Sequence, residues 1–88
     1  MKLKGDFMLR EVAGQSIVVP LGSSVVSVNG IITLTESAVV LWKKLEGGCE
    51  NADELTSALL NEYDVDRETA ERSVEEFLIQ LKEKDMIE

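Results

Sequence analysis

The chain has 88 residues, 9 of them basic and 17 acidic, which gives a net charge of −8, and it contains no histidine and one cysteine. This length favours a single domain over residues 1–88, and a hydrophobic share of 44% is enough for a core. The missing histidine excludes Ser-His-Asp and Cys-His pairs, and one cysteine excludes internal disulfides and CxxC zinc sites. We therefore expect no catalytic residue, cofactor-binding site or metal site, although an enzyme that uses carboxylates alone stays open.

The charge is unevenly distributed along the chain. Residues 1–49 hold four acidic and five basic residues, net +1, whereas residues 50–88 hold 13 acidic and 4 basic residues, net −9. The first half is rich in Val, Ile, Gly and Ser, and the second in Glu, Leu and Ala. This split predicts strands followed by helices within one α+β domain. No apolar run reaches the ~20 residues of a membrane helix, so we expect a soluble, cytoplasmic protein with no membrane partner.

Three strands are predicted, at about residues 7–12, 16–20 and 25–34, in an antiparallel sheet. Pro20 is expected to end the second strand because proline cannot donate to a ladder. Asn29-Gly30 lies between apolar runs and predicts a tight hairpin turn. Two pairings fit this turn: the flanking runs form a short extra ribbon, or only the second run joins the sheet.

Helices are predicted at about residues 36–46, 52–62 and 67–84 from apolar residues at helical spacing. Suitable N-caps precede them at Thr35, Asn51 and Asp66. Glu54 follows Asn51 by three residues, as in a capping box. Trp42 lies on the apolar stripe of the first helix, so we interpret it as a core residue rather than a stacking platform.

Two residues have no clear place in this pattern. Ile79 is predicted on the charged face of the last helix, where a single exposed isoleucine is more common than a partner contact. Cys49 has no histidine and no basic cluster nearby, so we interpret it as a loop cysteine rather than a nucleophile.

Strands followed by three helices are also the outline of a winged helix-turn-helix, which suggests DNA as one candidate ligand. A DNA-recognition helix should be basic, but residues 52–62 carry three acids and no lysine or arginine. A small sheet also leaves an edge strand with unpaired backbone groups, to which an extended peptide can add. The same edge could instead pair two copies of a small structural domain in a homodimer.

Three segments, in order, resemble the PqqD family. Residues 29–38 read Asn-Gly-Ile-Ile-Thr-Leu-Thr-Glu-Ser-Ala and are followed by Leu41-Trp42, close to the family pattern N-G-x-x-x-L-N-E-T-A/G with its apolar-Trp pair. Residues 59–66 look like the family segment L-x-x-E-Y-D-V-D, and Val74, Phe77 and Leu81 match its ending. Thr35 replaces the usual asparagine, and both residues cap helices. The resemblance covers about residues 7–88.

The resemblance implies a winged-helix-like RiPP recognition element that is not an enzyme. Such proteins bind the leader of a ribosomally synthesised precursor peptide and present it to a modifying enzyme, commonly of the radical SAM/SPASM type, in natural-product biosynthesis that includes PQQ. We therefore expect a peptide chaperone that is a monomer or weak homodimer and binds no nucleic acid. A winged-helix DNA-binding or transcription-associated adaptor is the alternative.

In the family, the leader adds as a strand to the third strand and lies against the third helix. Carried onto this sequence, this implies a groove between Ile31–Leu34 and the helix over residues 67–84. Alternation places Ile32 and Leu34 toward the core and Ile31 and Thr33 the other way. On the helix, a flank of the apolar stripe is the expected floor. The expected peptide-binding residues are Ile31, Ile32, Thr33, Leu34, Glu71, Glu75, Leu78 and Lys82.

Overall fold

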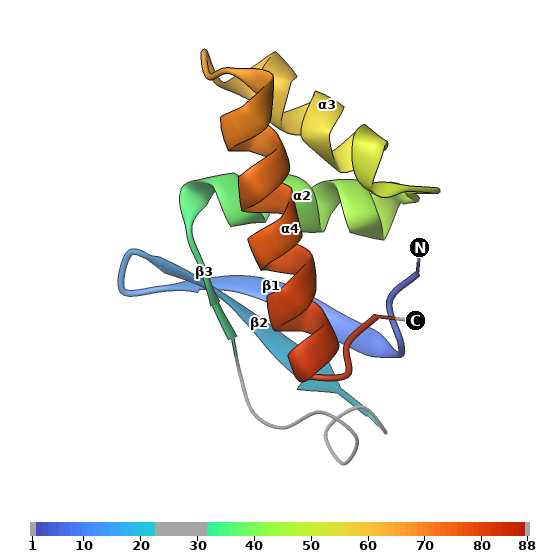
Figure 1. Ribbon diagram of the computed structural model, residues 1–88. Helices are drawn as coiled ribbons and strands as arrows, with labels where there is room; N and C mark the ends of the chain where they lie inside the picture. The colour runs from blue at the N-terminus through green and yellow to red at the C-terminus, as the bar shows by residue number, and fades with distance from the viewer. Residues whose placement is uncertain (1, 23–31, 88) are drawn as a thin grey trace.

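The computed structural model describes residues 2–22 and 32–87 and shows a sheet with helices on one side of it (Figure 1). The strands are β1 (Asp6–Val12), β2 (Gln15–Leu21) and β3 (Ile32–Leu34), antiparallel and in the order β1-β2-β3. The helices are α2 (Glu36–Gly47), α3 (Ala52–Glu62) and α4 (Arg67–Glu83). The predicted α+β fold class, a three-stranded antiparallel sheet followed by three helices, is confirmed.

β2 continues through Pro20, which we had expected to end it. Pro20 lies opposite Phe7 of β1, while β3 pairs only with Ser16–Val18. The proline therefore lies where β2 has no described neighbour on its β3 side, and a missing N–H is tolerated there. Of the predicted strand at 25–34, Ile32–Leu34 is observed. The Asn29-Gly30 turn, with its two candidate pairings, lies outside the described residues.

The β1–β2 hairpin turn consists of Ala13 and Gly14, one residue shorter than expected, because Gln15 already pairs with Val12. Both turn residues have positive φ, 52° at Ala13 and 79° at Gly14. This combination matches the twist of the flanking strands, but it strains any residue that has a Cβ atom.

Replacing Ala13 with asparagine should stabilise the protein. Asparagine tolerates positive φ better than alanine, and Asn-Gly is the preferred pair for such turns, so we expect the free energy of unfolding to rise by about 1 kcal/mol. Urea denaturation followed by circular dichroism measures this change. Ala13→Val is the control and should lower stability, because a β-branched residue resists positive φ. Equal midpoints for both variants would contradict the turn geometry.

The core lies between the helices and one face of the sheet. Trp42, Leu55 and Leu81 have no exposed surface, and the ring of Phe7 packs edge-on against Trp42 with centroids 5.7 Å apart. This burial confirms Trp42 as a core residue. Its Nε1–H is buried and finds no hydrogen-bond partner in the part of the chain that the structure describes.

The three predicted N-caps all accept a hydrogen bond from the first turn of their helix. Thr35 Oγ1 accepts from Ala38 N at 3.3 Å, and Asn51 Oδ1 accepts from Glu54 N at 3.2 Å. The expected capping box is only half formed, because the Glu54 carboxylate accepts from Glu50 N at 2.6 Å rather than from Asn51 N. The Glu54 side chain therefore bonds the backbone of Glu50, the residue before the cap, instead of the backbone of the cap residue Asn51.

Asp66 caps α4 and makes the stability of the protein depend on pH. The Asp66 carboxylate accepts from Thr69 N at 3.3 Å, and hydrogen bonding to Thr69 lowers the pKa of Asp66 below its ordinary value of 3.8. A carboxyl with a lowered folded-state pKa contributes stability above its unfolded pKa and loses it as pH falls through the folded one. Denaturation midpoints should therefore fall below pH 3.8 partly through this group. Asp66→Asn keeps a cap that does not titrate, so the acid-induced loss should be smaller. An unchanged pH profile would contradict this role.

The two ends of the chain meet beside the sheet. Leu3 forms an antiparallel bridge with Ile87, and Lys4 N donates to Met86 O at 2.8 Å. Met86 and Ile87 are buried, at 1% and 4% exposure, so the segment after α4 belongs to the core.

Candidate functional site

The outer edge of β3 is the first feature of the candidate site. β3 lies at the end of the strand order, and no described strand pairs with its outer side. Ile32 and Leu34 are buried, at 3% and 5% exposure, whereas Thr33 is exposed, as the alternation predicted. The core therefore holds β3 in place through two side chains, while its backbone edge can take another strand. Ile31 lies outside the described residues.

A hollow of about 150 Å³ adjoins the end of β3, where the chain enters α2. One wall comes from this junction and the other from α4. The lining residues are Thr35, Ser37, Ala38, Leu41, Ser73, Glu76, Phe77 and Gln80. Its lining begins at Thr35, directly after β3, and includes no residue of β3 itself. On α4 it takes one flank of the helix, represented by Ser73, Glu76 and Gln80. Our sequence reasoning did not single out these three residues.

The four helix residues that we expected at the groove lie together in a different hollow. Glu71, Glu75, Leu78 and Lys82 line a hollow of about 430 Å³ between α4 and the beginning of α3. Ala52, Asp53 and Thr56 supply the α3 side, and Val74 and Ile79 complete the α4 side. The expected residues therefore share one surface, but this surface includes no residue of β3.

The two hollows lie on opposite flanks of α4. At about 100° per residue, Glu75 and Glu76 fall on opposite sides of the buried stripe through Ala70, Val74 and Leu81, roughly 120° and 140° from its centre. Figure 1 shows β3 on one side of α4 and α3 on the other. The apolar pattern of α4 identifies both borders equally well. Only the packing of α3 and β3 distinguishes them, so no signal in the sequence could have done so.

The α3–α4 hollow is acidic at its rim and apolar at its floor. Arg67 lies at one end, with NH2 3.6 Å from Asp53 Oδ1 and Nε 3.8 Å from Glu71 Oε2. These pairs are exposed, so they contribute little to stability. The floor includes Val74, and Ile79 at the rim is 48% exposed. The exposure of Ile79 agrees with its predicted place on the charged face.

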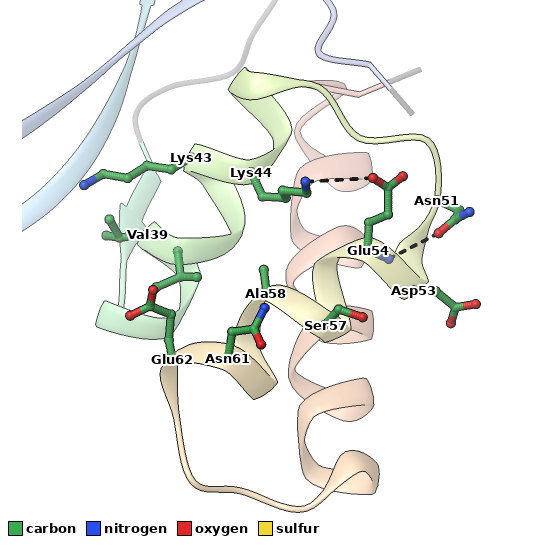
Figure 2. Close-up of a pocket in the computed structure, with 11 residues that line it drawn as sticks. Val39, Lys43, Lys44, Asn51, Asp53, Glu54, Ser57, Ala58, Asn61 and Glu62 are labelled. Carbon is green, nitrogen blue, oxygen red and sulfur yellow. Dashed lines mark hydrogen bonds and ion pairs between the residues drawn. The ribbon is translucent and has the colours of Figure 1, made fainter.

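A third hollow, of about 870 Å³, lies between α2 and α3 (Figure 2). Figure 2 shows short side chains of α3, such as Ser57 and Ala58, in this hollow. Lys44 spans it, with Nζ 3.8 Å from Glu54 Oε1. Both signs of charge line this surface, so it indicates no single class of ligand.

Other kinds of site find little support. Within residues 2–22 and 32–87, no cluster of His, Cys, Asp or Glu has the arrangement of a metal site. Cys49 is 8% exposed, and its thiol donates to Asn51 O at 3.1 Å, which suits a structural cysteine. In the same ranges, no helix has both the length and the apolar character needed to cross a bilayer.

The sequence also matches the model of a known family. The profile of the family described as Coenzyme PQQ synthesis protein D (PqqD) matches residues 15–87, which is most of the chain. The chain belongs to the PqqD family. No curated protein sequence matches this PqqD-family chain.

Two solved structures resemble the PqqD-family chain over nearly its whole length. TbiB1, solved in complex with the TbiA(beta) leader peptide, shares 26% identity at a TM-score of 0.76, with 100% of this chain and 95% of that one covered. Lasso peptide synthetase B1, complexed with the leader peptide, shares 24% identity at a TM-score of 0.69, with 97% and 93% covered. The second likeness shows the fold alone.

Proposed function

We propose that this protein binds the leader segment of a ribosomally synthesised precursor peptide by strand addition to β3 and presents it to a modifying enzyme. The observation that carries the proposal is the outer edge of β3, with which no strand of the described residues pairs, in a PqqD-family fold. TbiB1, a structural neighbour, was solved with a leader peptide bound. Backbone hydrogen bonds to an edge strand supply affinity for an extended peptide, and side-chain pockets supply specificity.

The hollow at the end of β3 supports α4 as the second wall of this site. A leader strand beside β3 would pass near the flank of α4 that carries Ser73, Glu76 and Gln80. Glu76 gives this flank a negative charge, which favours a leader with lysine or arginine at the facing position. We extend the proposal to a carrier without catalytic activity in the cytoplasm, working as a monomer or weak homodimer beside a radical SAM/SPASM-type enzyme.

Titration with a synthetic leader peptide tests the proposal directly. The leader of a precursor encoded near this gene should bind saturably to the isotope-labelled protein. Amide shifts should concentrate at Ile32–Leu34 and along α4. The proposed function would be refuted if no leader encoded near this gene bound to the protein.

Two adjacent glutamates of α4 test which flank lines the site. Glu76→Lys should weaken binding of a basic leader by about threefold or more, because it places a like charge at the β3 side. Glu75→Lys makes the same chemical change on the α3 side and should leave leader affinity unchanged. Calorimetry on both variants compares them. The reverse result would favour the originally expected set of Glu71, Glu75, Leu78 and Lys82.

Charge argues against the DNA-binding alternative. α3 carries Asp53, Glu54 and Glu62 and no basic residue, so it opposes phosphate binding. A gel shift with duplex DNA at low salt should show no retention. Retention that falls steeply with added salt would restore this alternative.

A further inference from the structure

The sheet has a second outer edge, that of β1, at the opposite end of the strand order from β3. β1 pairs with β2 along all seven of its residues, and no strand in the described part of the chain pairs with its other side. Proteins usually protect such an edge with proline, lysine, a bulge or a very short strand. None of these occurs in β1, which carries charges of both signs instead.

The turn of the β1–β2 hairpin determines which backbone groups face this edge. The closing pair of a two-residue turn is hydrogen-bonded, and here that pair is Val12 and its partner in β2. Bonded and non-bonded pairs then alternate along the ladder, so Phe7, Leu9 and Glu11 turn their N–H and C=O groups to the outer side. Pro20 agrees with this pattern, since it lies opposite Phe7 in a pair that needs no N–H.

The order of side chains along β1 makes this edge complementary to itself. Two copies of β1 can pair antiparallel about a two-fold axis at Met8. Asp6 of each copy then lies opposite Arg10 of the other copy. Phe7 lies opposite Leu9, and the outward backbone groups of these two residues can bond each other. Opposite charges therefore face each other on one side of the sheet, and apolar residues face each other on the other side, as stabilising cross-strand pairs do.

Other registers lose this match. With the two-fold axis at Leu9, the apolar Phe7 lies opposite the charged Glu11. With the axis at Phe7, Arg10 lies opposite Lys4, which is a like charge. An axis farther along the strand on either side sets a charged residue opposite its own copy, and intermediate registers turn side chains to the wrong face. The register with its axis at Met8 is thus the one that suits both the charges and the backbone.

The distribution of charge and burial permits two copies to approach at this edge. A net charge of −8 on each copy opposes association, but residues 50–88 carry −9 of it, whereas residues 1–49, which include β1, carry +1. Phe7 and Leu9 pack against the core and are only partly buried, and Met8 is 42% exposed. A second β1 would remove more of this apolar surface from water.

We propose that two copies of this protein associate through their β1 edges into a six-stranded antiparallel sheet, in which Asp6 and Arg10 pair twice across the axis. The edge itself specifies a second copy as its occupant, because the same strand, reversed, supplies each charge opposite its counterpart. Both β3 edges lie at the far ends of this sheet, so the dimer leaves both proposed leader sites open. The inference depends on β1 alone and holds whether or not a leader binds.

Sedimentation of the full chain over a concentration series measures the association. We expect a monomer–dimer equilibrium that Arg10→Asp and Asp6→Arg each weaken about tenfold, because each change sets like charges opposite each other at two places. The variant with both changes restores opposite charges and should recover the affinity of the wild type. Arg72→Asp is the matched control, since it makes the same change on an exposed residue of α4, and it should leave the association unchanged.

Three results would overturn the inference. The first is a wild-type protein that stays monomeric over the whole series. The second is a dimer that both single variants leave intact or that the double variant does not restore. The third is a dimer that excess leader peptide dissociates, which would place the contact at β3 instead. Leader titration of the Arg10→Asp variant tests the proposed function separately, because the leader site does not include β1.

Discussion

Trp42→Ala is expected to lower the free energy of unfolding by about 3–5 kcal/mol, the range observed when a buried aromatic residue is truncated. Trp42 has no exposed surface and packs against Phe7 of the sheet, so its loss leaves a cavity where α2 meets β1. Small domains have only about 5–15 kcal/mol of stability in total, so this variant should be close to unfolding. Urea denaturation followed by far-ultraviolet circular dichroism measures the change without the tryptophan signal.

Two further variants define what Trp42 contributes. Trp42→Phe should cost much less, because it keeps most of the apolar volume and removes a buried Nε1–H that has no described partner. Ile79→Ala is the surface control and should shift stability by no more than about 0.5 kcal/mol. Similar losses for Trp42→Ala and Ile79→Ala would show that the core is not centred on the tryptophan.

N-methylation along the leader peptide is expected to weaken binding at every second residue. A strand that adds to β3 turns alternate N–H groups toward it, and a methyl group removes the donor and leaves a β3 carbonyl unpaired. Each sensitive position should lose about 5-fold to 150-fold in affinity, since an unpaired backbone group costs ~1–3 kcal/mol. Fluorescence anisotropy with a series of singly methylated leaders measures the pattern.

The leader positions between the sensitive ones serve as the controls. Their N–H groups point away from β3, so N-methylation there should leave the affinity unchanged. A sensitivity that follows a period of three or four residues would indicate a helical leader. Uniform tolerance would indicate that side chains alone hold the peptide. Both results would exclude strand addition and leave peptide binding itself intact.

The helices and caps could be predicted because their signals are local. Thr35 and Asp66 stand just before apolar residues at helical spacing, and each accepts the hydrogen bond that its position implies. The alternation of buried and exposed residues in β3 could also be predicted, and Ile32 and Leu34 do share the buried face. Such features depend on a few neighbouring residues, and tertiary packing did not override them.

The surfaces of α4 and β2 could not be assigned in this way. Glu75 and Glu76 lie on opposite sides of the same apolar stripe, and only the packing of α3 and of the junction between β3 and α2 shows which hollow each of them lines. Likewise, Ile17, Val18 and Val19 all read as strand residues, but the side on which the helices pack decides which of them is buried. Sequence patterns identify candidate faces, and packing selects among them.

The bridge between Leu3 and Ile87 has a consequence for how this domain can be combined with others. A fold whose ends meet can be inserted into a surface loop of a second protein, or joined to it at either end, without separating its strands. Fusion to the modifying enzyme that we propose as a partner would make their association intramolecular, at a high effective concentration. Weak contacts would then be sufficient for transfer of the peptide. The carrier could thus work equally well as a free subunit or as a built-in segment.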